Sequence, residues 1–268
     1  MAFAENHGVK IHWDEQGQGA PVLLIMGLGA ASALWWRTRP ALASRYRTIA
    51  FDNRGVGHSD VPPGPYSVAA MASDAAAVLD AAGVQRAHIF GLSMGGMIAQ
   101  EFALQYPDRV QSLILGCTSP GGPNAVRAEP AANEVLRARA TMTMEQAEQA
   151  FIPFLYDAST PRVVVEEDLA RRRAWYPSTE GYTAQLQGIF IWQAYDRLPQ
   201  ISAPTLVIHG ANDRLVPPGN GRLIASRVPG ARLVIISDAN HLFTTDQPAA
   251  AHTAILQFLG EQAPPAQA

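Results

Sequence analysis

Residues 90–97 read FGLSMGGM: one serine, Ser93, stands between glycines at the end of an apolar run. The run predicts a buried strand, and the pattern of residues 94–106 predicts a helix that begins directly after the serine. Gly91 and Gly95, two residues before and two residues after Ser93, would let the backbones of strand and helix pass closely. A serine in this strand-turn-helix context is held out at the carboxyl end of its strand, as a nucleophile requires.

Further short apolar runs, bounded by turn residues, indicate the fold class. They occupy residues 22–25, 48–51, 87–90, 113–115, 205–208 and 233–236. Continuous apolar character is what strands need when both faces of a parallel sheet are covered. Helical patterns such as 68–82 lie between the runs, and the polar alternation of 4–15 predicts an antiparallel hairpin in front of them. We therefore expect an α/β fold with a mostly parallel, doubly wound sheet of about eight strands.

The alternation of strand and helix stops between about residues 121 and 199, where charged residues become more frequent and buried-strand runs disappear. This segment predicts a helical insertion that forms a cap, or lid, over the sheet. The core domain is then residues 1–120 and 200–262. Residues 263–268, APPAQA, are predicted to be a disordered tail.

Composition and charge exclude several classes of function. The chain has 268 residues, 48% of them apolar, and a formal net charge of −3, which provides no basic field for nucleic acid. No run approaches the roughly 18 apolar residues that a membrane span needs. The three arginines 171–173 are expected to form a solvated helix face. The first residues lack the features of a signal peptide, so we expect a cytoplasmic protein.

Metal and cofactor chemistry are not expected either. Cys117 is the single cysteine, which excludes an internal disulfide and a cysteine-based zinc site. No His-Glu-x-x-His motif or dense cluster of histidines and aspartates supplies other ligands. Neither composition nor motif decides whether the chain forms a homodimer.

A nucleophilic serine needs a base to take its proton and an acid to orient that base. The predicted strand 205–209 is followed by Asp213, and the last predicted strand, 233–236, is followed by His241. The chain order Ser93, Asp213, His241 places the acid and the base after separate later strands. We therefore predict these three residues as a catalytic triad.

Other acids and histidines compete for these roles. Asp238 and Asp246 lie too near His241 in sequence to come from a separate strand end. Six further histidines fall in the predicted hairpin, in a loop, inside strands or on a helix. They are His7, His12, His58, His88, His209 and His252. Only His241 lies in the loop directly after the final core strand, so it is the predicted base.

Acyl transfer by serine also needs two backbone N–H donors for the oxyanion. Met94, directly after the nucleophile, would supply one. Leu28, in the loop after the strand 22–25, would supply the other. The same loop, GLGAAS with Asp52 some distance on, partly matches a dinucleotide-binding fingerprint. Because Ser32 stands where that motif has its third glycine or alanine, and because a cofactor would leave the triad unexplained, we expect no cofactor.

With these residues in place, the chain resembles the α/β-hydrolase superfamily over about residues 4–120 and 200–260. The resemblance rests on residues 91–96, on the loop 51–59, and on the acid and histidine loops. It implies the α/β-hydrolase fold with a helical cap, and it implies that the loop 52–59 is a scaffold without a catalytic role. Many members carry His-Gly at the oxyanion loop, where this chain has Met26-Gly27, so the hydrogen bonds that support the loop must differ.

Within the superfamily, residues 60–67 together with 79–97 resemble the 3-oxoadipate enol-lactonase and carboxylesterase branch. The resemblance implies a small-molecule carboxylic ester or lactone as substrate. If it extended to the substrate of those enzymes, a cation such as Arg137 or Arg139 should face the pocket to hold a carboxylate.

Strand-end and cap residues predict an apolar acyl pocket. Its expected residues are Gly27, Trp36, Cys117, Phe151, Trp192, Leu215, Val216 and Leu242. The resulting hypothesis is a serine esterase or lactonase. Three alternatives stay open: hydrolysis of a carbon–carbon bond, cofactor-free perhydrolysis by the same triad, and a small-molecule receptor that retains a triad.

Overall fold

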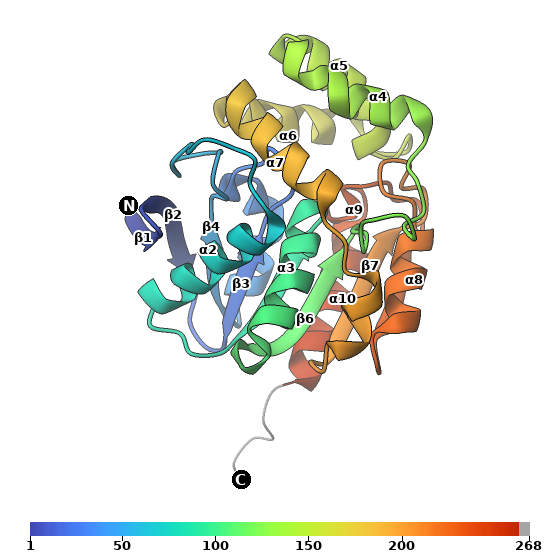
Figure 1. Cartoon of the computed structure of the whole chain (residues 1–268). Coiled ribbons are helices and arrows are strands. Elements are labelled where there is room, and N and C mark those ends of the chain that lie inside the picture. Colours follow the sequence, from blue (N-terminus) through green and yellow to red (C-terminus); the bar gives the residue numbers. More distant parts are fainter. Residues whose placement is uncertain (263–268) are drawn as a thin grey trace.

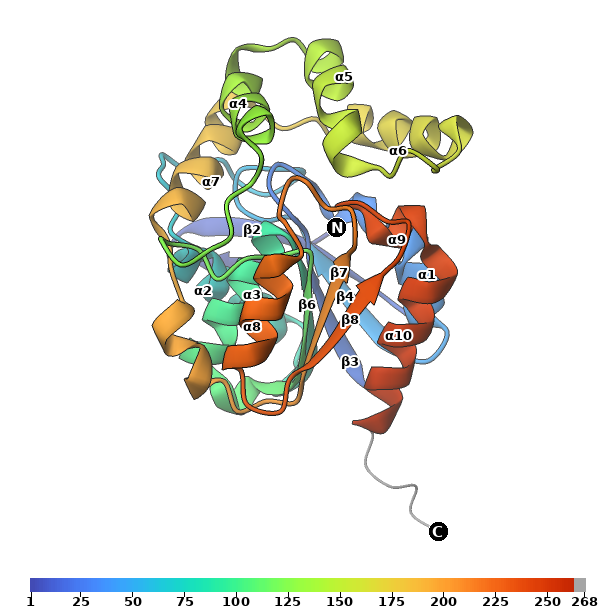
Figure 2. The same cartoon turned by 90° about the vertical axis from the view of Figure 1, so that its right-hand side faces the viewer.

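Eight strands form a single sheet in the computed structural model, which describes residues 1–262, and helices cover both of its faces (Figures 1 and 2). The strand order is β1-β2-β4-β3-β5-β6-β7-β8. The strands are β1 (Ala2–Asn6), β2 (Val9–Gln16), β3 (Pro21–Ile25), β4 (Arg47–Phe51), β5 (Ala87–Leu92), β6 (Val110–Gly116), β7 (Thr205–Gly210) and β8 (Arg232–Ile236).

The pairing of the strands confirms the predicted fold class. β1 and β2 form an antiparallel hairpin with Ala4 opposite Ile11, and β2 pairs antiparallel with β4. The pairs from β4 through β3, β5, β6 and β7 to β8 are all parallel. The hairpin begins at Ala2, two residues before the alternating pattern predicted it.

Each face of the sheet has its own apolar core, because successive side chains of a strand point to opposite faces. In β3, Leu23 and Ile25 pack into one core, and Val22 and Leu24 pack into the other. The first face is covered by α2 (Val68–Ala81), α3 (Met94–Gln105) and α8 (Gly219–Arg227). The second is covered by α1 (Arg39–Ala43) and α10 (Pro248–Glu261), with α9 (Phe243–Asp246) at its end. Figure 2 shows both layers edge-on.

The sequence predicts that strand β8 is buried on both faces, but the strand is partly exposed. Three residues of β8, Leu233 to Ile235, are only partly buried. β8 is an edge strand of the sheet, with β7 as its single neighbour, so helices cover it less completely. The apolar run predicted the strand correctly but not its position at the edge.

Four helices lie between β6 and β7, in the segment predicted as a cap. They are α4 (Pro130–Ala138), α5 (Met144–Leu155), α6 (Arg162–Ala174) and α7 (Thr179–Ile191). They extend over the end of the sheet where the parallel strands finish (Figure 2). Their action as a separate lid domain stays a prediction, and the predicted tail, 263–268, lies outside the described residues. Within residues 1–262, no helix has both the length and the apolar character needed to cross a membrane.

The close passage of strand and helix at the serine generates the first testable prediction. A side chain at Gly95 would begin 2.1 Å from the carbonyl oxygen of Ile25, a backbone atom that cannot move aside. Gly95→Ala should therefore lower the free energy of unfolding by at least the roughly 1–3 kcal/mol typical of overpacked cores. Urea denaturation of the purified variant measures this loss.

Gly260→Ala is the matched control, since no atom lies within 4 Å of a side chain at this position in α10. It should leave stability unchanged or raise it by about 0.5–1 kcal/mol, because alanine restricts the unfolded chain more than glycine does. Equal stability of the two variants would contradict the packing argument.

Candidate active site

Ser93 occupies a strained turn between β5 and α3. Its φ of +56° is rare for a residue with a side chain. The turn is held by the Ser93 N–H, which donates to the carbonyl of Gly116 at 2.9 Å. A side chain at Gly91 would begin 2.1 Å from the carbonyl oxygen of Gly95, so strand and helix are in backbone contact at this point. The predicted strand-turn-helix arrangement around the serine is therefore present.

Asp213 and His241 come together from the loops after β7 and β8. His241 Nδ1 lies 2.8 Å from Asp213 Oδ2. The other carboxylate oxygen of Asp213 accepts the backbone N–H groups of Leu215 at 3.0 Å and Val216 at 2.8 Å. Burial raises the pKa of Asp213, but the interactions with His241 and His209 outweigh burial and hold the pKa below its usual range. The acid therefore stays ionised and orients the imidazole.

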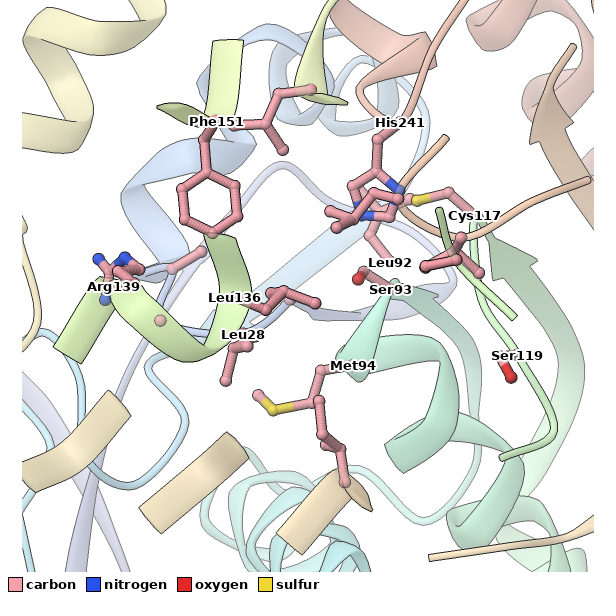
Figure 3. Close-up of a pocket in the computed structure, with 18 of the residues that line it drawn as sticks. Leu28, Leu92, Ser93, Met94, Cys117, Ser119, Leu136, Arg139, Phe151 and His241 are labelled. Carbon is pink, nitrogen blue, oxygen red and sulfur yellow. The ribbon is translucent and has the colours of Figure 1, made fainter. Parts of the chain in front are cut away.

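Ser93 and His241 line the same cavity, and Figure 3 shows the serine hydroxyl beside the imidazole. Within residues 1–262, the Ser93 hydroxyl makes no hydrogen bond to the second imidazole nitrogen. Such contacts are often long without a ligand and tighten when substrate binds. The structure thus assembles the three predicted residues with the acid–base contact formed and the base–nucleophile contact open.

His209 is a neighbour of the acid that the sequence did not identify. Its side chain is fully buried in β7, and its Nε2 lies 2.7 Å from the carbonyl of Val216 and 3.4 Å from Asp213 Oδ2. The sequence placed His209 inside a strand, which is correct. No local pattern distinguishes a strand histidine that contacts a triad acid from one that only fills the core.

The predicted oxyanion loop lies directly against the nucleophile. A side chain at Gly27 would begin 3.1 Å from Ser93 Cβ. The Gly27 carbonyl accepts the N–H of Ala30 at 3.2 Å, which closes a tight turn around Leu28. In the described part of the chain, no protein group accepts the N–H of Leu28 or Met94. Both amides are thus available to a ligand oxygen.

The alternative interpretation of this loop as a dinucleotide site finds no support. The segment after it is a 3₁₀ helix, Ser32–Arg37, instead of the longer helix that the fingerprint requires. Asp52 accepts hydrogen bonds from the backbone and the hydroxyl of Ser32 at 2.7 and 2.8 Å, and from the backbone of His58 at 3.0 Å. Its carboxylate is therefore occupied by the scaffold. Across residues 1–262, no group of three His, Cys, Asp or Glu side chains could hold a metal ion.

The cavity beside the serine has a volume of about 890 Å³ and is bounded by the sheet end on one side and by the helices α4 to α7 on the other. Its lining is mainly apolar. Besides Ser93 and His241, the lining includes these residues of the predicted site: Gly27, Leu28, Met94, Cys117, Phe151, Leu215, Val216 and Leu242.

Two predicted pocket residues lie elsewhere. The indole of Trp192 is buried against α3 and donates to Glu101 Oε2 at 2.7 Å. The indole of Trp36 lies outside this cavity, donates to Asp168 at 3.1 Å, and has the guanidinium groups of Arg37 and Arg171 over its ring at 4.0 and 4.1 Å. In both cases an indole N–H needed a buried acceptor, which the sequence could not locate.

Arginines provide the main charge in the cavity. The arginines that line it are Arg127, Arg137, Arg139 and Arg172, and the acids are Glu134 and Glu148. The guanidinium of Arg139 lies over the rings of Tyr176 and Tyr182, at 4.6 and 4.1 Å from their centroids. Figure 3 places Arg139 across the cavity from His241.

Neither Arg139 nor Arg172 forms a salt bridge with a carboxylate of residues 1–262, and Arg172 Nε is buried without a hydrogen-bond partner. Burial lowers the pKa of Arg139, and the charge of Arg172 acts in the same direction, but an arginine keeps its proton in proteins. Glu148 also lines the cavity and is neutralised by Arg173 at 2.8 Å. The expectation of a solvated face at 171–173 is therefore wrong for Arg172.

Comparisons with known proteins bear on the fold and the family of the chain. A family model described as the alpha/beta hydrolase fold matches residues 20–248. The crystal structure of an enol-lactonase from Burkholderia xenovorans is similar with a TM-score of 0.87 and 26% identity, covering 97% of this chain and 100% of that one. A thermophilic esterase from Thermogutta terrifontis gives a TM-score of 0.85 and 31% identity, covering 97% and 98%. A relative from Azorhizobium caulinodans, provisionally named a carbamate hydrolase, is 32% identical over 97% of this chain and 99% of its own.

The environment of Cys117 generates a prediction about reactivity. Burial raises the pKa of the thiol well above its usual value, and the negative charge of Asp213 adds to the effect. Since the thiolate is the reactive form, iodoacetamide at pH 8 should modify native Cys117 at least about 10-fold more slowly than the unfolded chain in guanidinium. Mass spectrometry is unambiguous here because the chain has one cysteine. Rapid modification of the native protein would contradict this.

Proposed function

Because the chain belongs to the α/β-hydrolase fold family, we propose that it is a serine hydrolase that cleaves a carboxylic ester or lactone through an acyl-serine intermediate. One observation carries the proposal. One cavity is lined by a serine in a strained turn and by a histidine. The histidine is hydrogen-bonded to a buried carboxylate at 2.8 Å, and two backbone N–H groups without a protein acceptor lie beside the serine. Nucleophile, base, orienting acid and oxyanion donors are the four parts that acyl transfer needs.

In the first step, His241 takes the hydroxyl proton of Ser93 while Oγ bonds to the substrate carbonyl carbon. The carbonyl oxygen becomes an oxyanion, to which the amides of Leu28 and Met94 donate. The ionised Asp213 stabilises the imidazolium that forms. The carbon–oxygen bond of the ester then breaks, and His241 gives its proton to the leaving alkoxide.

In the second step, water attacks the acyl-serine with His241 again acting as the base. The new oxyanion occupies the same two amides, and its collapse breaks the bond to Ser93 Oγ, which recovers its proton from the imidazolium. The products are a carboxylic acid and an alcohol, joined in one molecule if the substrate is a lactone.

The charges of the cavity support a substrate with an acidic group. The apolar lining suits a short acyl chain, and Arg139 at the far side from His241 has no carboxylate partner of its own among the described residues. A carboxylate in the substrate would therefore complete a pair that the protein leaves open. The names of the relatives support the reaction class, since an esterase, an enol-lactonase and a carbamate hydrolase all act at an acyl carbonyl.

Replacement of the nucleophile is the direct test. Ser93→Ala should lower the turnover of short p-nitrophenyl esters by a factor on the order of 10⁴ to 10⁶, because the covalent step is lost. It should also abolish labelling by a fluorophosphonate probe. Ser119→Ala removes another serine hydroxyl from the cavity and should retain both properties.

The same assay separates the alternatives. A receptor that retains a triad would be labelled by the probe but would turn over barely once, whereas a hydrolase would cycle many times per second. A carbon–carbon bond hydrolase or a perhydrolase would depend on Ser93 while turning over esters and lactones poorly. A Ser93→Ala protein that retains most of the wild-type esterase activity would contradict the proposal.

The carboxylate expected in the substrate leads to a separate prediction about Arg139. Arg139→Met should lower kcat/KM for the mono-p-nitrophenyl ester of a dicarboxylic acid by about 10- to 150-fold, the equivalent of a hydrogen bond to a charged group. The p-nitrophenyl ester of a neutral acid of the same length should change less than about 3-fold. Arg171→Met is the matched control, because this arginine stacks on Trp36 outside the cavity. Equal losses for both esters would show that Arg139 does not recognise a carboxylate.

A further inference from the structure

Helix α7 is docked on the core by two glycine contacts. A side chain at Gly181 would begin 2.0 Å from the carbonyl oxygen of Gly55, and one at Gly188 would begin 1.7 Å from that of Tyr66. Only glycine fits at either position, so the helix backbone lies directly on the loop that follows β4. Both contacts hold the same stretch of α7 in place.

Gln185 lies between these two contacts, four residues after Gly181 and three before Gly188, which puts it on the same helix face. Its side chain is fully buried. Its oxygen accepts the backbone N–H of Gly29 at 2.8 Å, and its nitrogen donates to the carbonyl of Arg54 at 2.7 Å. A single side chain from the cap segment thus bridges the oxyanion loop and the scaffold loop.

The Gly29 N–H is the central amide of the turn that presents Leu28. The turn is closed by the bond from Ala30 to the Gly27 carbonyl, and its third residue, Gly29, has a φ of +63°. In a trans peptide the C=O and the N–H point in opposite directions, so the orientation of the Gly27 carbonyl also fixes the direction of the Leu28 N–H. Gln185 holds the next peptide plane of the same turn.

We propose that Gln185 is a positioning residue for the oxyanion hole: it holds the turn 27–30 so that the Leu28 amide faces Ser93. The inference rests on the proposed function. The loop at Met26-Gly27, where the sequence departs from the His-Gly of the family that it resembles, has its own supporting hydrogen bonds. Here the Met26 carbonyl accepts Asn53 Nδ2 at 3.0 Å, and the cap supplies the remaining support through Gln185.

Loss of this side chain leaves two partly buried backbone groups without their partner, the Gly29 N–H and the Arg54 carbonyl. Such groups cost free energy unless the backbone moves or water enters. Backbone movement displaces the peptide planes of the turn, and a water molecule holds them less firmly than a side chain fixed in the helix does. An oxyanion donor acts only within hydrogen-bond distance of the developing charge. A displaced Leu28 amide should therefore reduce the stabilisation of the transition state more than it reduces the affinity for the substrate.

Two variants separate the effect of the Gln185 hydrogen bonds from the effect of its packing. Gln185→Met has nearly the same shape and removes both hydrogen bonds, whereas Gln185→Glu keeps the acceptor for Gly29 and loses the donor to Arg54. Trp192→Phe is the matched control. It removes a 2.7 Å bond between the segment after α7 and Glu101, a second contact between cap and core that does not involve the oxyanion loop.

For Gln185→Met we expect kcat on a neutral p-nitrophenyl ester to fall about 10- to 100-fold, somewhat less than the loss of a whole oxyanion donor, while KM changes less than about 2-fold. A trifluoromethyl ketone, which forms a tetrahedral oxyanion on a serine, should lose affinity by the same factor as kcat/KM. Hydrogen exchange of the peptide containing residues 26–30 should become faster. Trp192→Phe should keep the wild-type values, and Gln185→Glu should stay within about 5-fold of wild-type kcat.

Wild-type kcat and inhibitor affinity in Gln185→Met would overturn the inference, as would an equal loss in Trp192→Phe. If Gln185→Met does not fold, Gln185→Glu decides, and a loss of kcat above about 5-fold in the folded protein would also contradict the inference. If the wild-type protein itself turns over no ester, the proposed function fails. Hydrogen exchange then still measures whether Gln185 holds the loop, and unchanged exchange would reject it independently of activity.

Discussion

Backbone contact between β5 and α3 is the constraint on which the site depends. Gly91 and Gly95 bring the strand and the helix so close that the single residue of the sharp turn, Ser93, takes a left-handed conformation. This conformation costs free energy, and the N–H bond to Gly116 together with the buried core on both sides maintains it. The same approach brings the start of α3 against the end of β3, which places the oxyanion loop at the serine.

The charged part of the site relies on hydrogen bonds that the rest of the fold supplies. An ionised carboxylate buried like Asp213 would be unfavourable without partners. Two backbone amides of its own loop, His241 and the strand residue His209 supply those partners. The carboxylate is therefore stable in the interior only because the stretch 209–216 and the loop of His241 meet around it.

The helices between β6 and β7 do more than cover the cavity. Through Asp168, α6 binds the 3₁₀ helix at Arg37 with a 2.9 Å bond and α9 at Thr245 with a 2.7 Å bond. Through Gln185, α7 reaches the loop beside the nucleophile. The segment between β6 and β7 thus both lines the cavity and contacts the loop beside Ser93. In the proposed hydrolase, changes in that segment would alter both specificity and the geometry of the reacting groups.

The sequence by itself determined the fold class, the strand and helix order, and the residues expected to form the triad. Those features are carried by local patterns: apolar runs for buried strands, glycines around one serine, and an acid and a histidine after separate strand ends. Only the tertiary structure decided that Trp36 and Trp192 lie outside the cavity, that Arg172 lines it, and that β8 lies partly exposed at the sheet edge. It alone revealed Gln185 and His209. The reason is physical, because a polar side chain acquires its role from its buried partner, and that partner lies far away in the sequence.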